Sequence, residues 1–571
     1  MENTKKNGHP TGLWYLFGTE MWERFGYYLM LGIFSLYMID GWNNGGMGFD
    51  AQKKSDIYGT YLGLVYLTPF IGGLLADRIL GYRRSIIIGG LMMSAGYFAL
   101  SLHSETSFYI ALLLIILGNG FFKPNISTLV GNLYSSDDMK DKKDAGYNIF
   151  YMGINIGAFI CNFVAAYMRI NYGWGHAFAA AGVGMLIGVG VFLLGTKHIK
   201  HVDVVKPVQD GDMTTVKILS YTVLPMFAFG VLGYLIPGNF LGSDTNDAFI
   251  IGCLPVIAFF IYLAFTGDAK ESRAIKALLA VFACVILFFA IFHQNGDALT
   301  VWAEDHTDRE MSAGVADVAD QLGMAQIVVN NKIVSAPEAE FKATIDSLRG
   351  FEENMPAVTK KEIKAKSDFS GGISQLEKSR KYFETLPADK VPAEGKDLKL
   401  YSTELYQSMN PFWVVVLTPV VVGFFGWMRR RKREPSTPTK IAIGLVITAL
   451  SALVMVGAVF ATNDMTIKAG SMWLFASYGV ITVGELCLSP MGLSLVSKLS
   501  PPRITALMMG GYFLAISVGN KLSGMLSSLW EKFPQKENFF YLNFGLVLAA
   551  AVILILMLKW LNSVMRENNV Q

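Results

Sequence analysis

Charged residues are scarce in this chain. Asp, Glu, Lys and Arg make up 16% of its 571 residues, whereas hydrophobic residues make up 52%. Soluble globular proteins carry about 25% charged residues, so this composition excludes an ordinary soluble protein. The formal net charge of +3 is also too small to indicate binding to nucleic acid. Residues 1–11 are polar and run directly into the first apolar segment, without the pattern of a cleaved signal peptide.

Cysteine is scarce as well, and the usual signatures of catalytic or metal sites are missing. There are four cysteines, none in a C-x-x-C pair: Cys161, Cys253, Cys284 and Cys487. Each lies in an apolar stretch, so we expect buried free thiols and neither disulfides nor structural zinc. No metal-ligand spacing, nucleophile elbow or phosphate-binding loop stands out. We therefore expect no enzyme, no metal and no cofactor.

Long apolar runs are what the chain has in abundance. Runs of 18 or more apolar residues are long enough to cross a bilayer as helices, which predicts an all-α polytopic membrane protein. We expect fourteen spans, near 13–39, 56–79, 84–102, 108–131, 146–169, 175–195, 219–237, 248–266, 274–302, 409–428, 438–461, 471–498, 504–529 and 539–562.

Lysine and arginine gather in the connections after every second span and near both termini. Short loops rich in these residues face the cytoplasm, so we expect both termini on the cytoplasmic side. The segments assigned to that side are an N-terminal stretch at 1–12, a linker at 196–218 and a tail at 563–571.

The spans divide into groups of six, two and six. We expect an N-terminal six-helix bundle at 13–195 and a second bundle at 267–303 and 407–562, meeting at a central cavity. The pair within 219–266 carries few charges, which indicates an accessory hairpin that faces lipid or packs between domains.

Residues 304–406 interrupt the second bundle with a polar, charged stretch outside the cytoplasm. Helix-like pieces lie near 311–330, 336–348 and 370–386. This favours a partly ordered helical cap, with a disordered linker as the alternative. The residues that could form a small helical core are Phe341, Leu348, Phe351, Leu376, Tyr382 and Phe383.

The first span carries a polar face at membrane depth. At about 100° per residue, five side chains fall within an arc of roughly 140°: Glu20, Glu23, Arg24, Tyr27 and Tyr28. Charged groups cost roughly 3 kcal/mol each at the bilayer centre, so they normally face one another or a water-filled path. A surface-lying helix is the alternative, but residues 29–37 continue as an apolar run.

Several motifs carry a family resemblance. The stretch from Gly73 to Arg84 resembles the cytoplasmic loop signature of the major facilitator superfamily. The E-x-x-E-R-F-x-Y-Y sequence of the first span resembles the signature of proton-dependent oligopeptide transporters. Three further stretches agree with that family. They are 121–127 with its F-F-K-P-N sequence, 150–157 with F-Y-x-x-I-N-x-G, and 484–494 in the span expected at 471–498.

The resemblance covers essentially every span and leaves out only the 304–406 insert. It implies the major facilitator fold, with two six-helix bundles plus the hairpin. It also implies a monomeric, proton-coupled symporter that imports di- and tripeptides across the inner (cytoplasmic) membrane by alternating access.

The residue types suit a zwitterionic substrate. Arg24 and Lys123 are cations for its carboxylate, and Glu485 is the natural partner for its amino group. Amide and aromatic side chains complete the expected site: Asn155 and Asn410 for the peptide amide, and Tyr27, Tyr28 and Tyr66 for apolar faces with polar tips.

Proton coupling needs a titrating group in the same cavity. Glu20 and Glu23 lie beside Arg24 and Lys123 in the expected arrangement. Our hypothesis is that Lys123 pairs with one glutamate in the empty protein, and that protonation of this glutamate frees Lys123 for the substrate.

The chain departs from the family pattern at several positions. Many members carry an arginine seven residues after the signature Arg and an acidic partner in span seven, where this chain has Leu31 and His293. A histidine can titrate near physiological pH, so His293 could carry the proton. Asp297, at i+4, could raise the pKa of His293 or substitute as the acid. Alternatively, His293 only hydrogen-bonds within the bundle.

Two family tryptophans are also replaced, by Phe289 and Tyr512, which would reshape the side-chain pockets. Two alternatives to peptide import therefore stay open. One is symport of another zwitterion or anion, such as an amino acid or nitrate, and the other is a peptide sensor that does not transport.

Overall fold

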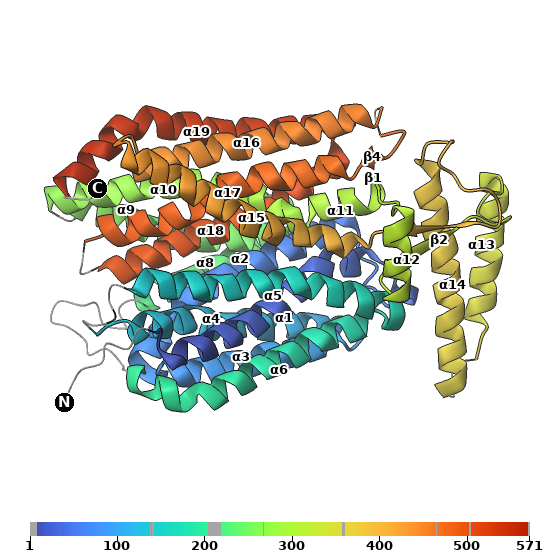
Figure 1. Cartoon of the computed structure of the whole chain (residues 1–571), viewed down its shortest axis with the longest axis horizontal. Helices are drawn as coiled ribbons and strands as arrows, with labels where there is room; N and C mark the ends of the chain where they lie inside the picture. The colour runs from blue at the N-terminus through green and yellow to red at the C-terminus, as the bar shows by residue number, and fades with distance from the viewer. Residues whose placement is uncertain are drawn as a thin grey trace.

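The computed structural model describes residues 8–136, 139, 142–203, 219–266, 268–356, 360–463, 465–501 and 504–568. Helices run side by side along most of its length, and a separate polar cap stands at one end (Figure 1). The first helix begins and the last helix ends at the opposite end (Figure 1). We call these the cap end and the far end.

A helix lies at each of the fourteen predicted segments. The N-terminal half contains α1 (Thr11–Ile39), α2 (Ala51–Leu75), α3 (Tyr82–Leu100), α4 (Glu105–Leu133), α5 (Lys143–Tyr172) and α6 (Trp174–Ile199). The C-terminal half contains α10 (Ala269–Phe292), α11 (Ala298–Asp305), α15 (Met409–Arg430), α16 (Thr437–Ala461), α17 (Met472–Leu499), α18 (Thr505–Ser527) and α19 (Lys536–Glu567). Within the described residues, nine helical segments are long and apolar enough to cross a membrane.

Each half has its own apolar core, and the halves meet along two helices. One core cluster draws on α1–α6, and a second on α10 and α16–α19. Helix α2 packs along α18, where Ser517 Oγ donates to Gly63 O at 2.6 Å. The four cysteines are buried and free, as the sequence predicts.

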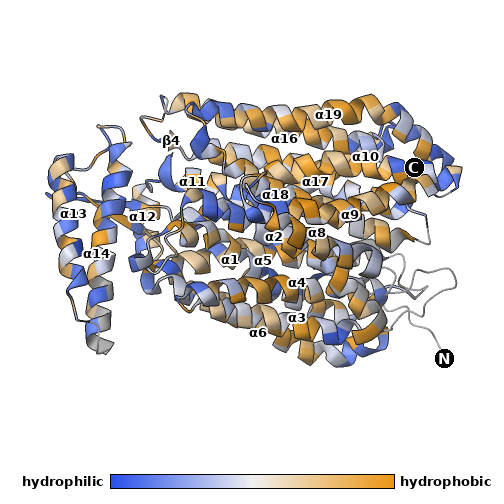
Figure 2. Ribbon diagram, turned by 180° about the vertical axis from the view of Figure 1, so that it is seen from behind, coloured by the Kyte–Doolittle hydropathy of each residue, from blue (hydrophilic) through white to orange (hydrophobic). Residues whose placement is uncertain are grey.

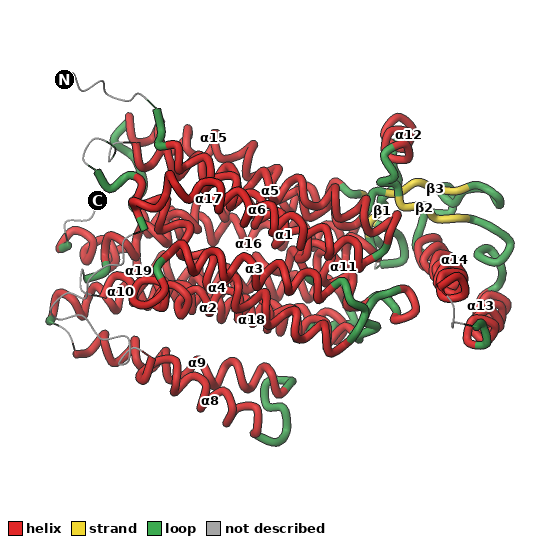
Figure 3. Tube along the Cα trace, turned by 90° about the horizontal axis from the view of Figure 1, so that it is seen from below, coloured by secondary structure: helices red, strands yellow, loops and turns green. Residues whose placement is uncertain are grey.

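The accessory hairpin lies at the side of the bundle (Figure 3). It consists of α8 (Leu224–Leu235) and α9 (Asp244–Thr266), which pack on each other. Phe249, Val256 and Phe260 of α9 join the core of the C-terminal half. Phe227 and Leu232 of α8 are exposed, which agrees with a lipid-facing position for this helix.

The span predicted at 274–302 is not continuous. Helix α10 ends at Phe292, a 3-10 turn occupies His293–Gly296, and α11 begins at Ala298. Asn and Gly are poor helix formers, and a side chain at Gly296 would collide with the ring of Tyr58. The break begins at His293, one of the positions at which this chain departs from the expected family pattern.

The insert is an ordered cap that combines helices with a small sheet. Helices α12 (Ala313–Gln321), α13 (Glu338–Glu353) and α14 (Lys360–Glu384) accompany the antiparallel strands β2 (Gln326–Val329) and β3 (Asp397–Leu400). Figure 2 shows α13 and α14 as largely hydrophilic beside the apolar bundle. The helix predicted near 311–330 is therefore wrong beyond Gln321, because the β-branched run Ile327–Val329 pairs as a strand.

The residues expected to form a single core of the cap fall in two separate apolar clusters. Phe341 packs with Ile345 and Ile373, flanked by Leu348 and Leu376. Tyr382 packs instead with Val328 and Leu400, flanked by Phe383. Phe351 remains 64% exposed, so its assignment to the core is wrong.

Part of the loop signature between α2 and α3 is described. The side chains of Asp77 and Arg78 lie outside the described residues. Gly81 has φ +78°, and Arg83 Nη1 lies 3.8 Å from Asp203 Oδ2 near the end of α6. A positive φ suits glycine, so this residue allows the tight turn into α3.

Candidate functional site

Arg24 and two glutamates form a buried charge cluster on α1. Arg24 Nη2 donates to Glu23 Oε1 at 2.6 Å, and its Nε pairs with Glu23 Oε2. Arg24 Nε also lies 3.3 Å from Glu20 Oε1. Glu23 thus holds the guanidinium through both oxygens, whereas the second oxygen of Glu20, Oε2, is buried without a hydrogen-bond partner among the described residues.

Neighbouring helices fix the position of Arg24. Its Nη2 lies 3.5 Å from Asn119 Oδ1 on α4, and Asn119 in turn donates to Val65 O on α2 at 2.9 Å. The guanidinium carbon lies 4.9 Å from the ring centre of Tyr27 and 5.9 Å from that of Tyr28. Three helices and two aromatic rings therefore hold this cation in place.

Lys123 lies over an aromatic ring, without an ion pair to any residue in the described part of the chain. Its Nζ is 4.2 Å from the ring centre of Tyr66. The expected ion pair of Lys123 with Glu20 or Glu23 is not formed. Arg24, which lies on α1 with the two glutamates, pairs with both carboxylates instead. In this form of the protein Lys123 interacts with them only at longer range.

His293 extends this arrangement into the C-terminal half. Its ring meets Tyr66 edge to face at 5.7 Å and stacks on Phe289 at 5.5 Å. Tyr66 therefore lies between Lys123 of one half and His293 of the other. The replacement Phe289 sits beside the site, as the sequence suggests.

Asp297 pairs with a lysine of the other half and not with His293. Its carboxylate forms a buried ion pair with Lys54 Nζ of α2. The expected pairing of Asp297 with His293 at i+4 is wrong, because the helix breaks between the two residues and turns Asp297 toward α2. Asp297 instead joins the two halves.

This ion pair yields a stability prediction. Asp297→Asn leaves the Lys54 ammonium buried without a charged partner, which costs roughly 3–5 kcal/mol. We expect the purified protein in detergent to melt several degrees below wild type. The double variant Lys54→Met, Asp297→Leu should recover most of the loss, since no charge is left unpaired. Equal melting temperatures for wild type and Asp297→Asn would contradict the assignment.

The C-terminal half contributes an acidic group on α17. Glu485 Oε2 accepts a 3.0 Å hydrogen bond from Asn410 Nδ2, which also donates to Thr482 Oγ1 at 2.9 Å. The hydroxyl groups of Tyr28, Tyr66 and Tyr151 lie close enough to Glu485 to interact with it electrostatically. The acid of one half therefore faces the aromatic side chains of the other.

Exposure separates the site into two layers. Glu20, Glu23, Arg24 and Tyr27 are buried. The side chains that remain partly exposed come from both halves: Tyr28, Tyr66, Lys123, His293, Asn410 and Glu485.

Asn155 and Tyr512, which were also expected in the site, contact residues of their own half in this structure. Asn155 Nδ2 donates to Tyr151 O of its own helix at 2.9 Å, which leaves its carbonyl oxygen as the acceptor for a ligand. Tyr512 is buried against Phe282, 5.7 Å between ring centres, and against Gly492. It belongs to the core of the C-terminal half in this structure.

The halves are joined by polar links at the cap end. Ser35 Oγ donates to Gly296 O at 2.7 Å, and Asn162 Nδ2 to Ser408 Oγ at 3.0 Å. Two buried ion pairs accompany the pair of Lys54 and Asp297: Arg169 Nε with Glu404 Oε1 at 2.5 Å, and Lys521 Nζ with Asp56 Oδ1 at 2.6 Å. The sequence reasoning missed these links, although an isolated Lys521 within an apolar span is the same kind of signal as Lys123.

Comparison with known proteins decides the family. A model described as the POT family matches residues 83–324 and 400–543. The chain belongs to the POT family. The family prediction is confirmed, and the chain is a multi-pass membrane transporter and not an enzyme.

Relatives match this POT family member over nearly the whole chain. It is 28% identical to a Di-/tripeptide transporter of Lactococcus lactis subsp. lactis (strain IL1403), over 98% of both chains. It is 25% identical to Dipeptide and tripeptide permease A of Escherichia coli (strain K12), over 91% of this chain and 84% of that one.

Solved structures share the fold. A crystal structure of peptide transporter POT in complex with sulfate matches with a TM-score of 0.73 and 28% identity, over 98% of this chain and 96% of that chain. A POT family transporter in complex with 5-aminolevulinic acid matches in fold with a TM-score of 0.71 and 23% identity, over 98% of both chains. The POT family member described here is therefore an all-helical membrane protein with the major facilitator fold of these transporters.

Proposed function

We propose that this protein is a proton-coupled symporter that imports di- and tripeptides across the cytoplasmic membrane by alternating access. The observation that carries the proposal is that cations of one half and an acid of the other border the same two tyrosines. Arg24 and Lys123 of the N-terminal half lie beside Tyr28 and Tyr66, respectively. Glu485 of the C-terminal half interacts electrostatically with both tyrosines. A short peptide is a zwitterion, so its two ends complement these two walls.

The proposed topology follows from the two bundles. Fourteen helices cross the membrane, the far end with both termini faces the cytoplasm, and the cap faces outward. The polar links described above close the cap end, as expected for a form that is shut on the outer side. The transporter acts as a monomer in this proposal. The names of the Lactococcus and Escherichia relatives support the peptide substrate.

Proposed roles follow from the contacts. Lys123 lies on Tyr66 and lacks an ion-pair partner within the described residues, so it receives the substrate carboxylate. Glu485 receives the amino group, and Asn410 orients Glu485 through their hydrogen bond. Phe289 and Tyr28 border the space for the side chains.

Glu20 is the proposed proton carrier. Glu23 is committed to Arg24 by two contacts, whereas Glu20 keeps one oxygen without a partner. A proton on that oxygen removes the charge of Glu20 but leaves Oε1 as an acceptor for Arg24, whose charge stays balanced by Glu23. His293, which touches Tyr66 next to Lys123, is the proposed second proton-handling group.

The role of Glu485 gives a test of the substrate class. In wild type, a free amino group pairs with Glu485, so Ala-Ala should compete for uptake about tenfold or more better than N-acetyl-Ala-Ala. In Glu485→Gln the charge pair is lost, so this preference should shrink to within about twofold. The measurement is the half-inhibitory concentration of each compound against labelled Ala-Ala in proteoliposomes.

The matched control is Glu531→Gln, which removes an exposed carboxylate of the C-terminal half outside the site. It should keep the wild-type preference. An unchanged preference in Glu485→Gln would reject the role of Glu485 in holding the amino group.

A second candidate substrate class rests on the altered span seven. His293 and Phe289 replace an acid and a tryptophan that the family pattern carries, and both border the site. A smaller zwitterion such as an amino acid suits such a changed pocket. Uptake of labelled amino acids with no uptake of Ala-Ala would favour this alternative.

A further inference from the structure

The insert is firmly fixed to the C-terminal half. Lys381 Nζ of α14 pairs with Asp305 Oδ1 at 2.6 Å, and the backbone N of Lys468 donates to Thr385 O at 2.8 Å. The short strand β1 (Thr307–Asp308) pairs with β4 (Ala469–Gly470) in front of α17. These contacts tie both the start of the insert and the end of α14 to the same half.

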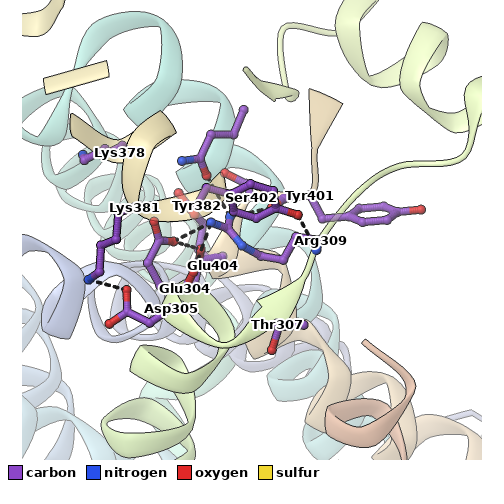
Figure 4. A network of polar contacts seen from close by, with 12 residues as sticks. Glu304, Asp305, Thr307, Arg309, Lys378, Lys381, Tyr382, Tyr401, Ser402 and Glu404 are labelled. Atoms are coloured by element: carbon purple, nitrogen blue, oxygen red, sulfur yellow. Dashed lines mark hydrogen bonds and ion pairs between the residues drawn. The ribbon is translucent and has the colours of Figure 1, made fainter. Parts of the chain in front are cut away.

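A buried arginine strengthens this attachment (Figure 4). Arg309 Nη2 lies 3.2 Å from Glu304 Oε2 of α11, and its Nη1 donates to Gln326 Oε1 and to Tyr401 O, each at 2.9 Å. The side chain is 2% exposed. Arg309 therefore joins α11 to β2 and to the residue that follows β3, so we expect the cap to move with the C-terminal half.

The same insert also reaches the N-terminal half. Lys378 Nζ donates to Asp40 Oδ2 at 3.1 Å, directly after α1. Ser370 Oγ donates to Asn43 O at 2.9 Å, and Asn171 Nδ2 near the end of α5 donates to Gly323 O at 2.7 Å. Lys378 and Lys381 are one turn apart on α14, yet they bind opposite halves of the transporter.

Asp40 passes this contact to two helices of the N-terminal half. Its Oδ2 also accepts from Trp174 Nε1 at 3.0 Å, at the first residue of α6. Its Oδ1 accepts from Asn44 Nδ2 at 2.9 Å. The carboxylate that Lys378 binds is therefore fixed to the ends of both α1 and α6.

The two attachments differ in kind. The apolar clusters of the cap contain only residues of the insert within the described chain. A cavity of about 320 Å³ lies between α14 and the bundle, lined by charged groups such as Asp40, Lys378 and Lys381. Apart from the ion pair of Arg169 with Glu404 at the end of the insert, the contact of the cap with the N-terminal half thus consists of a few polar bonds. These bonds can break and form again without exposing an apolar core.

We propose that the insert is a latch that fastens the N-terminal half through Asp40, Asn43 and Asn171, stabilises the form closed at the cap end, and releases when that end opens. The inference rests on the alternating-access part of the proposed function and not on the substrate. The ion pairs of Lys54 with Asp297 and of Lys521 with Asp56 lie between the bundles, whereas the latch acts from outside them. Its Lys378 and Ser370 lie in a segment that the family model leaves unmatched at 325–399, and Gly323 lies just before this segment.

A distance measurement tests the latch without any substrate. Spin labels on Thr106→Cys at the start of α4 and Met472→Cys at the start of α17 report the separation of the halves at the cap end. Both positions are exposed, and the four native cysteines are buried. The protein is studied in lipid nanodiscs by double electron–electron resonance.

The latch variant is Lys378→Ala, Ser370→Ala. Exposed ion pairs and single hydrogen bonds each shift an equilibrium by about two- to fivefold. We expect the ratio of the long-distance to the short-distance population to rise about fourfold or more over wild type.

The matched control is Lys342→Ala, Ser335→Ala. It removes the same residue types from the same insert, where Lys342 Nζ pairs with Glu338 Oε1 and Ser335 Oγ donates to Asn331 O. This control should match the wild-type distribution. A latch variant that also matches wild type would overturn the proposal, and so would a control that shifts as far as the latch variant.

A reversible cross-link gives the second readout. For this readout the spin labels at positions 106 and 472 are attached to genetically encoded ketone residues, which neither a thiol reagent nor a reductant affects. Asp40→Cys with Lys378→Cys, joined by a bifunctional methanethiosulfonate reagent, should remove the long-distance population of the spin-labelled protein. Reduction should release it, which also shows that the variant is folded. A long-distance population that persists in the cross-linked protein would overturn the latch. Because no peptide is present, failure of peptide uptake would leave this result unaffected.

Discussion

Lys123→Ala should lower gradient-driven uptake of labelled Ala-Ala about 100-fold or more in proteoliposomes. The side chain supplies an ammonium without an ion-pair partner among the described residues, next to Tyr66 and His293. Truncating one partner of a buried charge pair costs roughly 2–5 kcal/mol, and each 1.4 kcal/mol is tenfold. Counterflow of unlabelled against labelled peptide should fall equally, because the defect lies in binding.

A lysine outside the site provides the control. Lys197 is exposed in the last turn of α6, so Lys197→Ala should transport as wild type. Lys123→Arg keeps the charge but replaces a point charge by a planar fork, and should retain part of the activity. Wild-type uptake by Lys123→Ala would remove this residue from the binding site.

Glu20→Gln should separate transport from the proton gradient. Glutamine mimics the protonated acid, so the site stays in the substrate-ready state and no longer titrates. We expect counterflow within about threefold of wild type, while uptake driven by an inward proton gradient falls at least about tenfold. The two assays use the same proteoliposomes and the same labelled Ala-Ala.

Glu23→Gln is the matched comparison, since it makes the same chemical change one turn away. Glu23 binds Arg24 through both oxygens, so its neutralisation leaves a buried guanidinium poorly paired. Both counterflow and driven uptake should then be lost, and the melting temperature should fall. Equal behaviour of Glu20→Gln and Glu23→Gln would reject the division of roles between them.

The helical architecture could be predicted because membrane spans have a strong, local sequence signal. The charged residues of α1, Lys123 and Glu485 could also be found, since a charge in an apolar run is costly unless it functions. The contacts of these residues could not be predicted from the sequence. That Arg24 would occupy both glutamates, and leave Lys123 on Tyr66, depends on side-chain directions across three helices.

The break after α10 and the cap show the same limit. The sequence 294–297 contains poor helix formers, but the apolar residues on both sides extended the predicted span across it. In the cap, the strand pairing of β2 with β3 joins residues about 70 positions apart. Local periodicity carries no information about such a partner, so a helix was expected where a strand forms.

The measurement that tests the central claim most directly is the proton flux that a peptide evokes. Wild-type protein is reconstituted into proteoliposomes that enclose a pH-sensitive dye, with no imposed gradient, and Ala-Ala is added outside. The account predicts internal acidification that depends on Ala-Ala concentration and saturates, and that is absent in Glu20→Gln although counterflow persists. Peptide accumulation without acidification, or no response to Ala-Ala in wild type, would contradict a proton-coupled peptide symporter.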